Sequence, residues 1–163
     1  MVEFKYMKVR DVRSPERGTP LSAGIDFFVP RDFPKTFVAE QHDILIPSGI
    51  KAQIPEGYML IAEDKSGVVT SRDAKTLAGL PPTGERTCLK IGAKVIDEDY
   101  QGEIHIHIIN VGSNAVWIEP NQKIAQFILV PVSYAMPQEV HCLEELYPKQ
   151  TKRGNGGFGS TNK

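Results

Sequence analysis

The chain has 163 residues, with 19 lysines and arginines against 20 aspartates and glutamates, so its net charge at pH 7 is −1. This length suits one domain with a hydrophobic core, and the balanced charge argues against a basic surface of the kind that binds nucleic acid or acidic membranes. The two cysteines, Cys88 and Cys142, have no CxxC spacing, which argues against a disulfide scaffold or a zinc ribbon and suits a reducing compartment.

Neither the start of the sequence nor its apolar runs suggest a targeting or membrane segment. Residues 1–10 mix charged and apolar side chains and lack the apolar centre of a secretory signal. Residues 125–132 are too short to span a bilayer and include Gln126 and Pro131. We therefore expect no membrane partner and no nucleic-acid partner, and a polyanionic ligand would be held by a few placed cations.

Short apolar runs separated by Gly, Pro and Asn predict an all-β chain. Turn signals at residues 47–49 and 55–57 divide the first half of the chain. About ten short strands in one domain favour a sandwich, a jelly roll or a barrel. The expected strands lie at residues 5–9, 25–29, 42–46, 50–54, 59–63, 102–109, 115–118 and 124–131.

One of these strands alternates strictly between apolar and polar residues. Ile104, Ile106 and Ile108 fall on one face. His105 and His107 fall on the other face, where two imidazoles are compatible with metal binding. Because the sequence places no third ligand beside them, a half-exposed sheet face is the favoured interpretation.

A charged segment follows the expected strand at residues 59–63. Ser66 is either the N-cap of a short helix expected at residues 68–78 or a phosphate ligand. In the second interpretation it acts with Lys65 and with the backbone amide of Gly67, because hydroxyl, ammonium and amide donors at a helix start suit an anion.

Three acidic residues follow the apolar pair Val95 and Ile96, namely Asp97, Glu98 and Asp99. One interpretation is a polar hairpin tip without a function. Asp97, however, comes directly after the apolar run, so it is expected at the edge of buried structure, where a carboxylate can orient and deprotonate a water. Direct binding of a metal ion by the acids is a further interpretation.

Two stretches are predicted to be irregular. Residues 78–88 hold a Pro-Pro pair and two glycines, which indicate a surface loop. Residues 149–163 are polar and rich in glycine, with Phe158 as their only large apolar residue. We therefore expect a β-barrel domain at residues 1–148 and a flexible C-terminal arm at residues 149–163.

The arm contains a match to the dinucleotide-binding pattern GxGxxG at residues 154–159. No strand leads into this match and no helix has room to follow it, so it is not that fingerprint. One interpretation of the arm is a disordered tail. The other is a segment that closes over a ligand, with Arg153 at a phosphate and Phe158 stacked on a flat ring.

Taken in order, these segments resemble the five motifs of the homotrimeric dUTPase family. The resemblance spans residues 22–161, and the last motif, which reads RGNGGFGST, contributes most to it. The five matching segments are residues 22–26, 65–67, 94–102, 122–126 and 153–161.

The resemblance implies a jelly-roll-like β-barrel subunit and a homotrimer in which each active site is built from all three chains. It implies hydrolysis of dUTP to dUMP and diphosphate with Mg²⁺. It also implies a cytoplasmic enzyme, or one in the nucleic-acid-synthesis compartment of a host cell.

By the same resemblance, Asp97 activates the water that attacks the α-phosphorus. Asp26 holds Mg²⁺ through water, while the triphosphate supplies most of the ligands of the ion. Lys65, Ser66 and Gly67 contact the phosphates.

The remaining expected contacts also follow from the resemblance. Gln126 contacts the α-phosphate, and Arg153 contacts the γ-phosphate. Tyr100 packs under the deoxyribose and leaves no room for a 2′-hydroxyl, and Phe158 stacks on the uracil. The expected substrate-binding set is completed by Lys94, Gly157 and Ser160.

The chain departs from the family pattern at four places. Lys65 and Lys123 stand where arginine is usual, which replaces a bidentate fork by a point charge. Lys94 stands where glycine is usual, close to where backbone groups read the base, so its side chain is expected to narrow or re-aim the pocket. The second and third motifs lie about fifteen residues further apart than is usual, a loop length that is tolerated thermodynamically, and residues 78–88 are expected to carry the insertion.

Three alternatives remain open from the sequence. The first is an enzyme of the same superfamily with another base preference, for example for dCTP. The second is a regulatory protein that binds a partner through the loop at residues 78–88. The third is a structural β trimer, which gives no reason for Arg153 and Phe158 in a glycine-rich tail.

Overall fold

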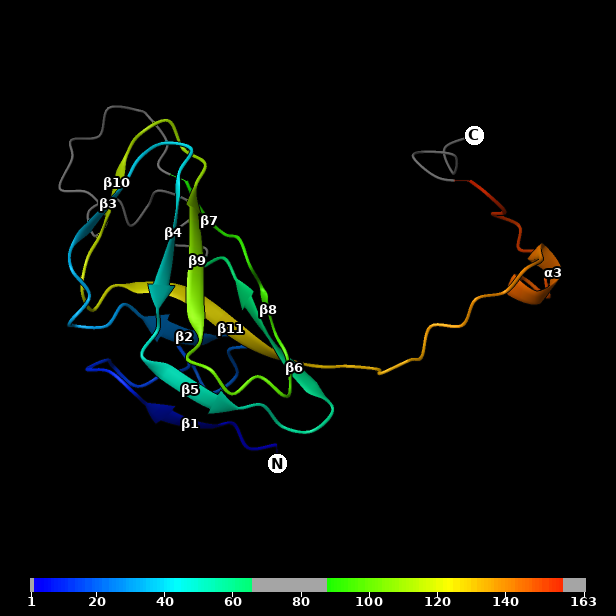
Figure 1. The fold of residues 1–163 in the computed structure, drawn as a ribbon, viewed down its shortest axis with the longest axis horizontal. Helices are drawn as coiled ribbons and strands as arrows, with labels where there is room; N and C mark the ends of the chain where they lie inside the picture. Colours follow the sequence, from blue (N-terminus) through cyan, green and yellow to red (C-terminus); the bar gives the residue numbers. More distant parts are fainter. Residues whose placement is uncertain (1, 66–87, 157–163) are drawn as a thin grey trace. The chain divides into compact units, whose positions relative to one another are not determined.

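The computed structural model describes residues 2–65 and 88–156 (Figure 1). The chain divides into two units, Met1–Ser133 and Tyr134–Lys163. Within the described residues it forms eleven strands and one short helix, α3. In chain order the strands are β1 (Lys5–Lys8), β2 (Ile25–Phe28), β3 (Thr36–Val38), β4 (Asp43–Pro47), β5 (Ile50–Gln53), β6 (Tyr58–Glu63), β7 (Leu89–Ile91), β8 (Val95–Ile96), β9 (His105–Asn110), β10 (Val116–Ile118) and β11 (Lys123–Pro131).

The strands of the first unit form four antiparallel sheets. The largest has the order β2-β11-β6-β8, and a three-stranded sheet has the order β4-β9-β7. Two pairs, β1 with β5 and β10 with β3, complete the arrangement. Figure 1 shows that strands distant in the sequence lie side by side, such as β2 and β11. The all-β fold expected from the sequence is confirmed.

Strand β9 contributes one continuous face of the core. Ile104, which precedes the strand, and Ile106 and Ile108 within it are each at most 1% exposed. His105 is exposed and His107 is half-buried on the other face. The predicted alternation is therefore confirmed, because successive side chains of a strand point to opposite faces of a sheet.

Strand β11 is the centre of the larger sheet, since it pairs with β2 on one side and with β6 on the other. Its residues Ile124, Ala125 and Phe127 are buried. The rings of Phe27 and Phe127 lie 4.3 Å apart between centroids and are tilted against each other, which is a favoured arrangement for a buried aromatic pair. This packing fixes the two strands that carry Asp26 and Gln126.

Three strands were not predicted, namely β3, β7 and β8. Each has two or three residues, which is too short for a period of two to stand out in a sequence. They are formed by pairing with longer strands: β3 with β10, β7 with β9, and β8 with β6. The helix expected at residues 68–78 and most of the loop expected at residues 78–88 lie outside the described residues.

The second unit contains the helix α3 (Leu143–Leu146), which has no buried residue. Large apolar side chains of this unit are exposed, among them Met136 and Leu143. In the part of the chain that the structure describes, no helix has the length and apolar character needed to cross a membrane. The predicted boundary between residues 148 and 149 remains a prediction.

Candidate active site

A buried carboxylate lies at the centre of the candidate site. Asp26 is in β2, whose four residues are all buried, and it is 5% exposed. Its two oxygens contact two ammonium groups: Oδ1 lies 3.4 Å from Nζ of Lys65, and Oδ2 lies 2.8 Å from Nζ of Lys123. A buried charge is tolerated when it is paired in this way. The fold thus brings together Asp26 and Lys65, two of the expected site residues.

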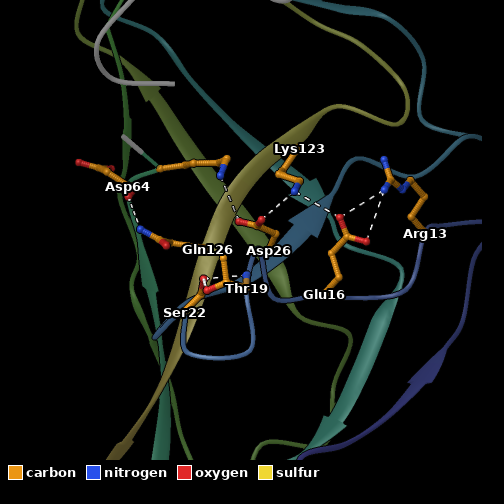
Figure 2. Close-up of polar contacts among 9 residues, drawn as sticks. Arg13, Glu16, Thr19, Ser22, Asp26, Asp64, Lys123 and Gln126 are labelled. Carbon is orange, nitrogen blue, oxygen red and sulfur yellow. Dashed lines mark hydrogen bonds and ion pairs between the residues drawn. The ribbon is translucent and has the colours of Figure 1, made fainter. Parts of the chain in front are cut away.

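Lys123 connects this carboxylate to a second acid. Its ammonium lies 3.2 Å from Oε1 of Glu16, which in turn accepts a 3.3 Å hydrogen bond from Arg13 (Figure 2). The hydrogen bond to Asp26 raises the pKa of Lys123, burial partly opposes this rise, and the hydrogen bond to Glu16 adds to it. Lys123 therefore stays charged across the physiological range.

Gln126 lies beside this cluster on β11. Its Nε2 donates a 2.8 Å hydrogen bond to the carbonyl oxygen of Asp64 (Figure 2). Gly24, just before β2, lies so close to this side chain that a methyl group on it would overlap the amide of Gln126. The absence of a side chain at Gly24 thus gives Gln126 the space it occupies.

Glu63, the last residue of β6, and Asp64, which follows it, connect the cluster to the end of β7 and to the segment before β8. Oδ1 of Asp64 accepts a 2.6 Å hydrogen bond from the amide of Ile91. Oε2 of Glu63 lies 2.9 Å from Nζ of Lys94, and this hydrogen bond raises the pKa of Lys94 against a small opposing effect of burial. The ammonium of Lys94 is therefore held at β6.

The segment after β8 carries the predicted water-activating residue. Asp97 is exposed, and its carbonyl oxygen accepts a 3.2 Å hydrogen bond from the amide of Tyr100. The hydroxyl of Tyr100 donates a 2.8 Å hydrogen bond to the carbonyl oxygen of Glu103. A methyl group on Gly102 would overlap the Tyr100 ring, so glycine at this position lets the ring lie across the turn.

The side chain of Glu103, whose backbone carbonyl contacts Tyr100, is itself held in place by hydrogen bonds. Its Oε1 accepts hydrogen bonds of 2.8 Å both from Nε of Arg10 and from the amide of Gly49. Burial raises the pKa of Glu103, but the bonds from Arg10 and Gly49 outweigh this effect and lower it overall. Glu103 is thus held as a carboxylate by Arg10 and Gly49, while its backbone carbonyl contacts Tyr100.

The structure describes only part of the predicted site. Arg153 is exposed, and its Nε donates a 2.8 Å hydrogen bond to the carbonyl oxygen of Gly156 within the second unit. The predicted phosphate and base contacts Ser66, Gly67, Gly157, Phe158 and Ser160 lie outside the described residues.

The sequence analysis did not identify the roles of Glu63, Asp64 and Glu103. Each is an acid within or beside a motif, so its position was visible, but its partners were not. Glu63 contacts Lys94, 31 residues away, and Glu103 contacts Arg10, 93 residues away. Such partners are decided by strand pairing.

The family model of the dUTPases matches residues 10–162. The deoxyuridine 5'-triphosphate nucleotidohydrolase of Chlamydia pneumoniae is 37% identical over 147 residues, which cover 90% of this chain and 89% of that protein. The enzyme of the same name from Fusobacterium nucleatum is 31% identical over 163 residues, which cover 99% of this chain and 98% of that protein.

Solved structures show the same likeness. The dUTPase of Staphylococcus bacteriophage 80alpha with dUPNHPP has a TM-score of 0.76 at 23% identity, covering 98% of each chain. A mutant dUTPase from phage phi11 of S. aureus, which coordinates a structural Mg(II) ion, has a TM-score of 0.68 at 22% identity and covers 88% of this chain and 99% of that one. The jelly-roll-like β fold predicted from the sequence is thereby confirmed.

Proposed function

The chain belongs to the dUTPase family of hydrolases, and from this membership we propose that it hydrolyses dUTP to dUMP and diphosphate. One observation carries the proposal. The sheet order β2-β11-β6-β8 brings the buried Asp26 and Lys123 into the same sheet as the strand that ends directly before Asp97, and Lys65 follows β6 of that sheet. The ammonium groups that would bind the triphosphate and the carboxylate that would activate the water thus lie on or next to one β-sheet.

Asp97 activates the attacking water in this proposal. Its exposure at the end of β8 leaves the carboxylate open to water and substrate. The water attacks the α-phosphorus in line with the bond to the bridging oxygen, its proton passes to Asp97, and diphosphate leaves.

The triphosphate is held by Lys65, Lys123 and Gln126 together with Ser66 and Gly67. An ammonium group has three donors, and each lysine uses at least one of them on Asp26. Both lysines can therefore contact Asp26 and a phosphate oxygen at the same time, so the buried carboxylate keeps its partners when substrate binds.

Mg²⁺ fits these residues as an ion that arrives with the substrate. The triphosphate would supply most of its ligands. When bound, the ion offsets the negative charge that grows on the leaving diphosphate. Asp26 would hold the ion through water.

The nucleoside is read by the turn after β8 and by the arm. Tyr100 packs against the deoxyribose, and backbone groups at Lys94 read the base. In the arm, Phe158 stacks on the uracil and Arg153 contacts the γ-phosphate, while the backbone and hydroxyl donors of the arm complete the phosphate contacts. Those donors are contributed by Gly157 and Ser160.

The active form is a homotrimer whose sites are shared between chains. None of the described residues of Tyr134–Lys163 belongs to the hydrophobic core, which suits a segment that packs on another subunit. In this proposal the arm of one chain crosses to the site of a neighbour.

The first test measures diphosphate release by the purified protein with Mg²⁺ from dUTP, dCTP, dTTP and UTP. We expect dUTP to have the highest kcat/KM and EDTA to abolish turnover. If the protein released diphosphate from dCTP but not from dUTP, the proposed substrate would be wrong and dCTP would take its place. If it released diphosphate from none of the four nucleotides, the proposed function would be overturned.

The variant Asp97→Asn tests the mechanism. Because the amide cannot accept the proton of the water, we expect kcat to fall by about 10²–10⁴-fold with little change in KM. Asp99→Asn, on the same turn, is the matched control and should keep its activity. Full activity of Asp97→Asn would exclude Asp97 as the base.

A further inference from the structure

His107 contacts the segment that leads to the base-reading residues. The ring lies on the outer face of β9 and its side chain is 25% exposed. Nδ1 lies 3.0 Å from the amide nitrogen of Ala93, and Nε2 lies 2.9 Å from Oδ2 of Asp43 on β4. The backbone carbonyl of His107 accepts a 2.9 Å hydrogen bond from the amide of Gly92.

These contacts determine the tautomer of the ring. The amide of Ala93 is a donor, so Nδ1 must be the acceptor and cannot carry a proton. Nε2 therefore carries the proton and donates it to the carboxylate of Asp43, which is the arrangement in which one imidazole uses both nitrogens.

The ring occupies space that only a glycine leaves open. A methyl group on Gly92 would overlap Nδ1 and its neighbouring ring carbon. The close approach places the imidazole directly against the backbone of residues 92–94, so a shift of either part displaces the other.

Residues 92–94 connect β7 to β8 and belong to neither strand. His107 accepts two of the hydrogen bonds that hold them, and the carbonyl oxygen of Lys94 accepts a 2.7 Å bond from the amide of Ala62. Since Ile106 and Ile108 of β9 are buried in the hydrophobic core, His107 connects this segment to a core strand.

We propose that His107 is a positioning residue for base selection, whose imidazole, held by Asp43, anchors Ala93 and so sets the path of the backbone at Lys94. The inference rests on the proposed function, in which that backbone reads the base. His107 does not touch the substrate; it acts through the amide of Ala93.

The test compares two substitutions at one position. His107→Asn places an amide oxygen where Nδ1 lies and keeps an acceptor for Ala93, whereas His107→Phe keeps a ring without an acceptor and leaves the amide unpaired. His42→Phe is the matched control, because the ring of His42 is exposed and contacts only the carbonyl oxygen of Glu40 among the described residues.

The kinetic readout is the ratio of kcat/KM for dUTP to that for dCTP, which does not depend on how much of a variant is folded. We expect His107→Phe to lower this ratio about tenfold, as for an unmade hydrogen bond, and His107→Asn and His42→Phe to keep it within about threefold. An unchanged ratio in His107→Phe, or an equal loss in His107→Asn, would overturn the proposal.

The second readout uses the wild-type protein and so does not depend on the folding of a variant. Long-range ¹H–¹⁵N spectra at mildly alkaline pH should show the Nε2–H tautomer of His107, and the Nδ1–H tautomer would overturn the anchor. Absence of dUTP hydrolysis by the wild type would overturn the proposed function and the base-selection role with it, whereas a wrong tautomer in an active enzyme would overturn the anchor alone.

Discussion

Two lysines stand where the family motifs usually carry arginine, and both contact the same carboxylate. An arginine fork binds a carboxylate or a phosphate through two parallel bonds, whereas an ammonium is a compact charge that several acceptors can share. Lys123 is shared by Asp26 and Glu16 in this way. The replacement therefore changes the geometry of the proposed phosphate site while leaving its charge intact.

Lys94, which replaces the usual glycine, lies in the segment between β7 and β8, and its side chain contacts another strand. The expectation that its side chain narrows or re-aims the base pocket stays a prediction. Its ammonium contacts Glu63 on β6, so the side chain has a partner within its own subunit.

The contribution of Glu103 to the stability of the fold is expected to depend on pH. Because the fold lowers its pKa, its stabilising effect is present above the usual carboxyl range and is lost as the pH falls through the lowered value. We expect Glu103→Gln to lower the melting temperature at pH 7 by about 2–4 °C. The difference from the wild type should vanish in strong acid.

Melting curves across the pH range measure this effect, with Glu56→Gln, an exposed acid, as the control. A difference that persists unchanged below the lowered pKa would mean that Glu103 acts through its shape and not through its charge.

At the scale of elements, the contact between Gly24 and β11 determines the position of Gln126 in the proposed phosphate site. The segment before β2 approaches β11 so closely that any side chain at Gly24 displaces the amide of Gln126. The close approach of these two segments thus requires glycine at position 24, because only glycine leaves room for the side chain of Gln126.

We expect Gly24→Ala to lower kcat/KM for dUTP by about 10- to 100-fold, because a misplaced contact at the reacting phosphate costs this much. Gly18→Ala is the matched control, since a methyl group there would only make ordinary contact with Ser22. Steady-state kinetics with dUTP measure kcat/KM of both variants and of the wild type. Equal activity of Gly24→Ala and the wild type would show that Gln126 is not needed in its observed position.

At the scale of the whole molecule, the shared-site proposal predicts complementation between inactive chains. One variant carries Asp97→Asn, and the other lacks residues 149–163. Neither trimer should turn over dUTP, because every site lacks either the base or the arm. Mixed trimers should contain some sites that combine an intact Asp97 with an intact arm from another chain.

Co-refolding equal amounts of the two chains should recover about a quarter of the wild-type rate if the chains assort at random in a closed trimer. Light scattering on each preparation checks that three chains assemble. Failure of the mixture to gain activity, with trimers present, would show that the base and the arm act within one chain.

The sequence determined those features that depend on local pattern. The alternation of Ile104, Ile106 and Ile108 predicted a core strand, because side chains of a strand alternate between faces. The order of the motifs indicated the family, and the apolar pair before Asp97 led to the expectation that this residue lies at the edge of buried structure, although the two-residue strand β8 was not itself predicted.

Only the tertiary structure decided which side chains meet. The partners of Glu63, Asp64 and Glu103 lie between 27 and 93 residues away in the chain, and their contacts follow from strand order and register, which no local pattern encodes. The same holds for His107, whose role depends on a ring, an amide and a carboxylate from three different segments. Short strands such as β8 likewise exist because a longer neighbour supplies the hydrogen bonds that two residues cannot make alone.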